Sequence, residues 1–393
     1  MLKTSSTPAL RPASARARSM PRSAIREIMA LAAERADVVH LEVGEPDAIT
    51  PQHIIDAAFQ AARAGWTKYS SNSGLPALRQ LIAQRVSRRW RTEVPAAQVV
   101  VTTGAIGALY TAITTVVEAG DEILIPDPGW PNYESIAHLI GATAVRYGLQ
   151  AKGGFLPDPD EIASKVTART KAILINTPGN PTGAVFPREL MARLAEIARE
   201  RGLYLVSDEI YEDIVFRGEH VSIGEFGLGA QAFVISGFSK SFAMTGWRLG
   251  WLVCPPELAA VATGLQEPLT SCASTIAQKA GEAALSGPQD CVAAFRDTFR
   301  RRRDILVEVF GESGLLPMVP EGAFYGLVEV SRTGLKSLEF AKRFLLERNV
   351  ATVPGITFGP SCDRYVRVAF TIEDERLRDG LERLREFIEK PKG

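Results

Sequence analysis

Short apolar runs alternate with longer amphipathic stretches along most of the chain. The apolar runs are rich in β-branched residues and bounded by polar or turn residues, which predicts strands at 98–102, 122–126, 171–176, 203–208, 232–237 and 250–254. Apolar positions recur with helical spacing over 52–64, 75–90 and 187–202. Strands that are apolar on both faces and alternate with helices predict an α/β fold with a mostly parallel, doubly wound sheet.

The pattern changes at both ends of the chain. After about residue 290, a long basic helix (295–310) precedes a strand at 324–330, a helix at 337–348, a strand at 365–370 and a final helix. This order predicts a smaller α+β domain. Near the N-terminus, 22–35 has helical spacing, and VVHLEV at 38–43 predicts a strand that ends in a Gly-Glu-Pro-Asp turn.

Composition and charge exclude several classes of protein. Lys plus Arg and Asp plus Glu both number 45, so no overall field attracts nucleic acid or an anionic membrane. No apolar run is long enough to span a bilayer. The four cysteines are scattered and lack metal-ligand spacing, so we expect no metal site and inert thiols in the cytoplasm. The first residues are basic without an acid before Glu27, but no apolar segment follows, which favours a flexible arm over a targeting signal.

Four polar groups follow predicted strands, where ligands bind in open α/β sheets. TTGAIG (102–107) joins a strand to a helix, so its backbone N–H groups suit a phosphate, although a plain tight turn has the same residues. NTPGNPTG (176–183) is a loop stiffened by prolines that can hold Asn176 and Asn180 still. The alternative for each asparagine is a turn cap.

Two further groups carry charge. Asp208 ends the strand LYLVSD, where we expect a desolvated carboxylate with a cationic partner, or else the N-cap of a following helix. Tyr211 lies one helical turn later and would face the same cleft. Lys240 and Arg248 lie in SGFSKSFAMTGWRLGW (236–251), whose aromatic flanks indicate a buried segment rather than the usual surface cations.

These groups together indicate one cofactor. A phosphate site, a buried acid, an amide with a phenol, and an amine are the groups that bind pyridoxal 5′-phosphate. The amine forms a Schiff base with its aldehyde, and the acid keeps its pyridine nitrogen protonated.

The chain resembles the class I and II aminotransferases, which are pyridoxal-phosphate enzymes of fold type I. The resemblance runs from about residue 20 to the C-terminus and rests on six motifs: LEVGEPD (41–47), YSSNSGLPALRQ (69–80), NTPGNPTG, SDEIY (207–211), SGFSKSFAMTGWRLGW and VRVAF (366–370). It implies a flexible arm over 1–21, a small domain made of 22–48 and 290–393, and a large cofactor-binding domain over 49–289. It also implies a homodimer with shared active sites.

The resemblance assigns a role to individual residues. Lys240 resembles the Schiff-base lysine, Asp208 the partner of the pyridine nitrogen, and Tyr211 the donor to the ring oxygen. The remaining cofactor contacts would come from Gly104, Ala105, Ile106, Trp130, Asn180, Ser239, Arg248 and, from the other subunit, Tyr69. The substrate carboxylate would meet Arg367, helped by Asn180, Gly44 and the nearby Trp130. Some relatives have a serine three residues before the lysine; Gly237 stands there, which leaves Ser239 as the hydroxyl contact.

The implied reaction is a ping-pong transfer of an α-amino group from an amino acid, aspartate-like or aromatic and apolar, to a 2-oxo acid such as 2-oxoglutarate. A C–S β-lyase, a decarboxylase or a cyclopropane-forming synthase of the same fold would keep nearly all of these residues. A transcription regulator would need a DNA-binding module before this fold, and the N-terminal segment is too short for one. A nicotinamide dehydrogenase is disfavoured because the one matching glycine pattern, at 227–232, precedes a strand instead of following it.

Overall fold

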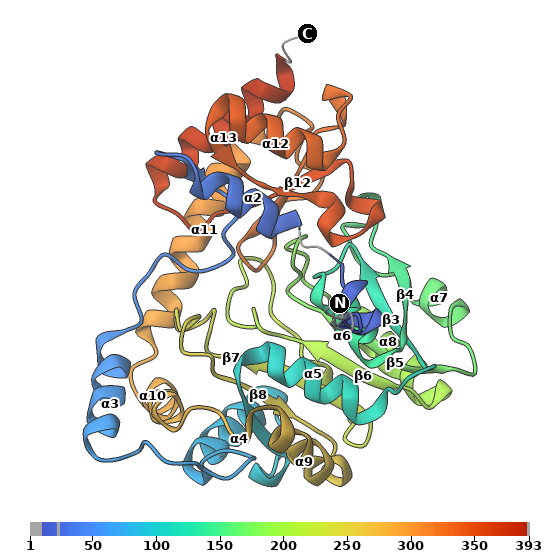
Figure 1. Cartoon of the computed structure of the whole chain (residues 1–393), viewed down its shortest axis with the longest axis vertical. Coiled ribbons are helices and arrows are strands. Elements are labelled where there is room, and N and C mark those ends of the chain that lie inside the picture. Colours follow the sequence, from blue (N-terminus) through green and yellow to red (C-terminus); the bar gives the residue numbers. More distant parts are fainter. Residues whose placement is uncertain (1–9, 22–23, 391–393) are drawn as a thin grey trace, which may run out of the picture.

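A seven-stranded sheet forms the centre of the larger part of the molecule (Figure 1). The computed structural model describes residues 10–21 and 24–390. The strand order is β2 (Val99–Thr102), β8 (Gly250–Val253), β7 (Ala232–Gly237), β6 (Tyr204–Asp208), β5 (Thr170–Asn176), β3 (Glu122–Asp127) and β4 (Thr143–Gly148). Strand β8 pairs antiparallel with both of its neighbours, whereas the other paired strands run parallel. The predicted α/β fold with a mostly parallel sheet is confirmed.

Helices cover both faces of this sheet. Neighbouring strand residues point to opposite faces, so Val100 packs in one apolar core and Val99 and Val101 in the other. The first core contains α5 (Gly104–Val116), α6 (Asn132–Ile140) and α9 (Ala259–Thr270). The second contains α3 (Gln52–Arg63), α4 (Pro76–Trp90), α7 (Pro159–Ser164), α8 (Arg188–Arg201) and α10 (Thr275–Ser286). Because both faces are buried, the inner strands of the sheet are mostly apolar, which is the pattern that the sequence displays.

A smaller α+β unit lies above the large sheet in Figure 1. Its antiparallel sheet has the order β11 (Val353–Pro354), β12 (Tyr365–Ala369), β9 (Tyr325–Glu329). Helices α2 (Ala24–Ala33), α11 (Asp290–Phe310), α12 (Ser337–Arg348) and α13 (Asp374–Glu389) surround it. Strand β1 (Val39–His40) pairs with β10 (Val350–Ala351), so the N-terminal segment joins the C-terminal part of the chain. The domain limits at 48/49 and 289/290 stay a prediction.

Two expectations need correction, and one strand was not predicted. The strand predicted over 38–43 is limited to β1, and residues 41–45 cross the candidate site as an irregular segment. No helix follows Asp208, because residues 210–213 form turns instead. Strand β4 escaped prediction because it is an edge strand whose residues are mostly half-buried, so its sequence lacks a strong apolar pattern.

The described part of the N-terminal arm contains a single helical turn, α1 (Ala15–Arg18), which lies against α6. Ser19 Oγ and His138 Nε2 are 3.1 Å apart there. The flexibility predicted for 1–21 stays a prediction, and residues 1–9 fall outside the described ranges. None of the described helices combines the length and the apolar character needed to cross a membrane.

Candidate active site

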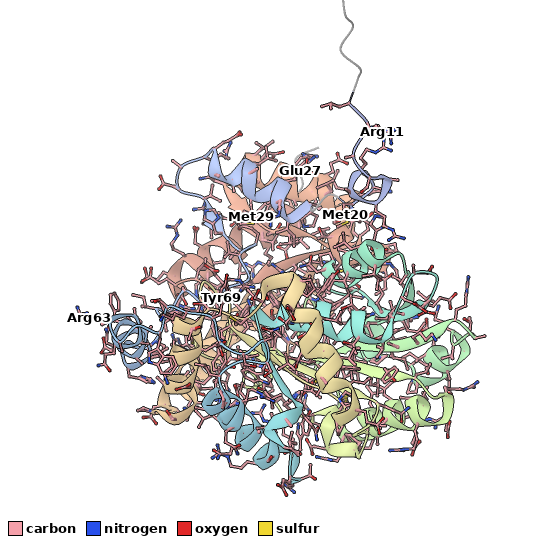
Figure 2. All side chains as sticks on the ribbon, turned by 60° about the horizontal axis from the view of Figure 1, so that its bottom comes forward. Arg11, Met20, Glu27, Met29, Arg63 and Tyr69 are labelled. Carbon is pink, nitrogen blue, oxygen red and sulfur yellow. The ribbon has the colours of Figure 1, made fainter. Side chains whose placement is uncertain are left out.

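A cavity of about 580 Å³ lies at the carboxyl ends of β5, β6 and β7, between the two units. Its walls include almost every residue that the sequence selected: Gly44, Ala105, Ile106, Trp130, Asn180, Asp208, Tyr211, Ser239, Lys240, Arg248 and Arg367. Gly104 lies just outside the lining, against the Arg248 guanidinium. Tyr69 is the exception, since 88% of it is exposed on the surface of its own chain (Figure 2).

Lys240 reaches the cavity from the loop after β7. Its Nζ donates a hydrogen bond of 2.6 Å to the carbonyl oxygen of Gly44. The pKa of this amine is lowered to about 8, mainly because the amine is buried and also because Arg367 and Arg248 are positively charged, while the negative charge of Glu45 opposes the shift. A substantial fraction of the amine is therefore neutral, and hence nucleophilic, near physiological pH.

Asp208 ends β6 and is almost fully buried. Its Oδ2 accepts a hydrogen bond of 2.8 Å from the Tyr133 hydroxyl, and its Oδ1 accepts one of 3.3 Å from the backbone N–H of Ile210. Burial raises the pKa of Asp208 to about 6, because the Tyr133 and Ile210 hydrogen bonds offset only part of the desolvation. The hydrogen-bond partner of Asp208 is thus the Tyr133 phenol rather than the expected cation. The Asp208 carboxylate can therefore pair with a positive charge on a ligand.

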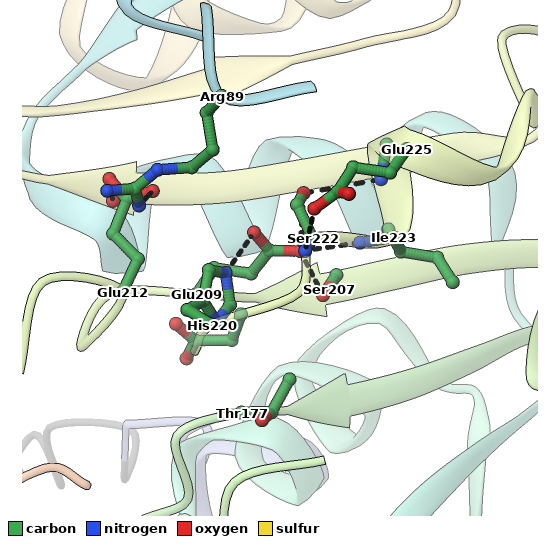
Figure 3. A network of polar contacts seen from close by, with 12 residues as sticks. Arg89, Thr177, Ser207, Glu209, Glu212, His220, Ser222, Ile223 and Glu225 are labelled. Carbon is green, nitrogen blue, oxygen red and sulfur yellow. Dashed lines mark hydrogen bonds and ion pairs between the residues drawn. The ribbon is translucent and has the colours of Figure 1, made fainter. Parts of the chain in front are cut away.

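A buried polar network fixes the chain directly behind Asp208 (Figure 3). The Glu209 carboxylate accepts hydrogen bonds from Ser207 Oγ at 2.8 Å, Ser222 Oγ at 3.0 Å and Ile223 N–H at 3.1 Å. His220 Nε2 lies 2.8 Å from its other oxygen. Each bond to an ionised carboxylate is stronger than a neutral one, so the peptide next to Asp208 is held firmly.

The network includes a group with the composition of a metal site. Ligand atoms of Glu209, Glu212 and His220 lie within 4.8 Å of one another. The carboxylate of Glu212, however, pairs with Arg89 and accepts from Ser236 Oγ at 2.9 Å, and Glu209 is saturated by the donors described above. These contacts favour a structural network over an ion site.

The loop after β5 holds its two asparagines in different roles. Asn176 Nδ2 donates to the Asp208 carbonyl at 2.9 Å, and Asn176 Oδ1 accepts from the Asn180 N–H at 2.8 Å. The side-chain Oδ1 of Asn180 accepts a hydrogen bond of 3.1 Å from Arg367 Nη1. The Asn180 amide nitrogen therefore keeps its hydrogens for a ligand in the cavity.

Arg367, on β12, is 3% exposed, and among the described residues its hydrogen bonds go to the Asn180 side chain and the Glu42 backbone rather than to a carboxylate. Its Nη2 donates to the Glu42 carbonyl at 2.6 Å, and its guanidinium carbon lies 4.3 Å from the centre of the Tyr325 ring. Within residues 10–21 and 24–390, its Nε is buried without a hydrogen-bond partner. A buried guanidinium with a free donor is a site for the carboxylate of a ligand.

The opposite end of the cavity suits a phosphate. Helix α5 begins at Gly104, and Ala105 and Ile106 of its first turn line the cavity, so unpaired N–H groups point there. A Cβ added at Gly104 would lie 2.5 Å from Arg248 Nη2, so the glycine makes room for the guanidinium. Arg248 itself adopts a left-handed backbone conformation, with φ of +53°. Ser239 adds a buried hydroxyl.

Sequence reasoning missed several residues of the cavity wall. Tyr133 lies three residues after Trp130, in the stretch DPGWPNY (127–133), from which only the tryptophan was assigned a role. Tyr325 belongs to a strand whose apolar pattern indicated core. Ile25 and Met29 come from α2, far away in the sequence, so only the tertiary fold reveals them.

The donor set fits pyridoxal 5′-phosphate together with an amino acid. Helix N–H groups with an arginine, a buried acid, a neutral amine and a second buried arginine correspond in chemistry to phosphate, pyridine nitrogen, aldehyde and α-carboxylate.

Comparison with known proteins agrees with this chemistry. Residues 36–384 match the family described as aminotransferase class I and II. The aspartate/prephenate aminotransferase of Thermus thermophilus is 38% identical over 88% of this chain and 90% of its own. The arginine–pyruvate transaminase of Pseudomonas aeruginosa is 37% identical over 88% of this chain and 89% of its own. The structure of the Thermus thermophilus aspartate aminotransferase with maleate has a TM-score of 0.91 at 37% identity, covering 95% of this chain and 99% of that one. The chain therefore belongs to the class I and II aminotransferases, and it is a transaminase that depends on pyridoxal phosphate.

Proposed function

We propose that the cavity around Lys240 is the site of transamination and that Lys240 carries the cofactor as a Schiff base. The single observation behind this proposal is the convergence of a depressed-pKa amine, a buried acid and a buried arginine in one cavity. When bound, pyridoxal phosphate joins its aldehyde to a primary amine and draws electrons away from the adjacent Cα. Lys240 would act there as the general base that takes the substrate Cα proton and as the general acid that gives it back.

The other wall residues hold the cofactor in this proposal. Asp208 stabilises the proton on the pyridine nitrogen, while Tyr211 and Asn180 donate to the ring oxygen. Ser239, Arg248 and the α5 N-terminus (104–106) bind the phosphate, and Trp130 stacks on the ring. Each role agrees with the charge and the hydrogen-bonding capacity left free in the cavity.

Arg367 would bind the α-carboxylate of the substrate, with Asn180 and the backbone of Gly44 beside it. The planar guanidinium can hold a carboxylate through two parallel hydrogen bonds and so orient Cα toward Lys240. Away from the phosphate end, the cavity wall also includes the apolar side chains of Ile25 and Met29 from α2. We propose an aspartate-like or an aromatic and apolar donor, with 2-oxoglutarate as acceptor.

A donor screen tests this function. The purified enzyme is incubated with single amino acids and either 2-oxoglutarate or pyruvate, and both oxo-acid products are measured. Stoichiometric exchange of amino and oxo groups supports the proposal. Release of ammonia without exchange would instead support the C–S β-lyase alternative.

We also propose a homodimer in which Tyr69 reaches the phosphate of the partner's site. The support is that four large apolar side chains within residues 49–69 are exposed: Ile49, Phe59, Trp66 and Tyr69 are 82%, 64%, 42% and 88% exposed. Light scattering measures the mass, and Tyr69→Phe should weaken cofactor binding without altering that mass. A monomeric holoenzyme would contradict this arrangement. Location in the cytoplasm stays a prediction.

A further inference from the structure

Tyr325, on β9, contacts three groups of the proposed site at once. It is buried, and its hydroxyl oxygen lies 2.9 Å from the Tyr211 hydroxyl oxygen. The same hydroxyl lies 3.4 Å from the carbonyl oxygen of Gly44. Its ring supports the Arg367 guanidinium at 4.3 Å. Tyr325 thus connects the small α+β unit with the cofactor side and the substrate side of the cavity.

The glycine at position 44 permits this arrangement. A Cβ added at Gly44 would lie 2.4 Å from the Tyr325 hydroxyl oxygen, which is closer than any real contact. The Gly44 carbonyl also accepts the 2.6 Å hydrogen bond from Lys240. The backbone at Gly44 therefore brings Tyr325 and Lys240 to a common acceptor.

The hydroxyl protons of Tyr211 and Tyr325 can form hydrogen bonds in two alternative directions. Burial raises the pKa of both Tyr211 and Tyr325, so each phenol keeps its proton at neutral pH. If Tyr325 donates to Gly44, then Tyr211 donates to Tyr325 and has no proton left for a ligand. If Tyr325 donates to Tyr211, the Tyr211 proton points into the cavity, and the chain of donors strengthens that bond.

We propose that Tyr325 is a positioning residue for transamination: its hydroxyl directs the Tyr211 proton to the ring oxygen of the cofactor, and its ring holds Arg367 ready for the substrate carboxylate. This inference rests on the proposed function. A weaker Tyr211 donor would leave more negative charge beside the nitrogen that Lys240 contributes, so that nitrogen would hold its proton to higher pH.

A matched pair of variants separates the hydroxyl from the ring. In the holoenzyme, Tyr325→Phe should raise the pH midpoint of the visible cofactor absorption by roughly half a unit to one unit and lower kcat about fivefold, with KM for the amino donor unchanged. Tyr325→Leu should also raise that KM about fivefold, because the ring beneath the guanidinium is lost. Tyr147→Phe removes a buried hydroxyl that donates to the Leu174 carbonyl at 2.8 Å and should leave the pH midpoint, kcat and KM unchanged.

Two outcomes would overturn the inference: an unchanged midpoint in Tyr325→Phe, or a KM change of the same size in both variants. A double variant, Tyr211→Phe with Tyr325→Phe, keeps the test valid if Tyr325→Leu does not fold. It should have the midpoint of Tyr211→Phe alone, since Tyr325 acts through Tyr211. Failure of the proposed function would look different, because the unmodified enzyme would then lack visible cofactor absorption altogether.

Discussion

The Nζ of Lys240 lies 2.6 Å from the carbonyl oxygen of Gly44, although 196 positions separate the two residues. The contact ties the loop after β7 to the irregular segment 41–45 of the smaller unit. The cavity is therefore closed by both parts of the chain, and the environment of the lysine depends on both.

The depressed pKa of Lys240 predicts how cofactor loading depends on pH. Only the neutral amine attacks an aldehyde. With a pKa of about 8, the neutral fraction rises about tenfold per pH unit well below pH 8, about fivefold from pH 7 to 8, and levels off above pH 8. The loading rate of the apoenzyme, followed by visible absorption, should have this profile. A rate that is flat between pH 6 and 8 would contradict it.

Glu45 provides a variant of the same experiment. Its negative charge raises the pKa of Lys240, so Glu45→Gln should lower that pKa and speed loading at pH 7. The matched control is Glu200→Gln, which removes an exposed carboxylate on α8, and it should load at the unmodified rate. Slower loading in Glu45→Gln would show that the carboxylate acts in some other way.

Tyr133 should govern the ionisation of Asp208. Its hydrogen bond holds the pKa of Asp208 down against the effect of burial, so Tyr133→Phe should raise that pKa above about 6. At neutral pH more of Asp208 would then be protonated and unable to face a positive charge. Loss of a hydrogen bond to a charged group costs about 1.5–3 kcal/mol, which corresponds to a fall in kcat of about tenfold or more. The acid limb of the pH–kcat profile should move to higher pH, and an unmoved limb would contradict the assignment.

Much of this site could be predicted because the point where an apolar strand ends can be recognised in a sequence. Asp208, Asn180 and Lys240 follow apolar runs, and parallel strands bring their carboxyl ends to one edge. Tyr325 and Ile25 could not be selected in this way. They approach from the smaller unit, and only its docking decides which of its side chains reach the cavity. The partner of Asp208 was also hidden, because a helical tyrosine has the same pattern whether it packs in a core or donates to an acid.

The network behind Asp208 should stabilise the fold. His220→Ala removes a donor from the buried Glu209 carboxylate and should lower the free energy of unfolding by about 1.5–3 kcal/mol. The control is Arg193→Ala, whose ion pair with Glu196 has side chains 43% and 54% exposed. That change should stay within about 0.5 kcal/mol. Denaturant unfolding of the two variants measures the difference, and equal effects would argue against a strong buried network.

Arg367 should determine substrate affinity without holding the cofactor. Arg367→Lys keeps a positive charge but loses the planar fork, so KM for the amino donor should rise about tenfold or more. Cofactor affinity, measured by titration of the apoenzyme, should stay nearly constant. If Arg367→Lys lost cofactor affinity while its KM for the amino donor stayed constant, Arg367 would contact the cofactor rather than the substrate carboxylate.

Reduction of the holoenzyme with borohydride, followed by peptide mass mapping, tests the central assignment most directly. Borohydride converts the bond between a lysine and the cofactor into a stable amine. We predict that the cofactor becomes fixed on the peptide that contains Lys240 and that the visible absorption is lost. Fixation on a different lysine, or none on any peptide, would contradict the account.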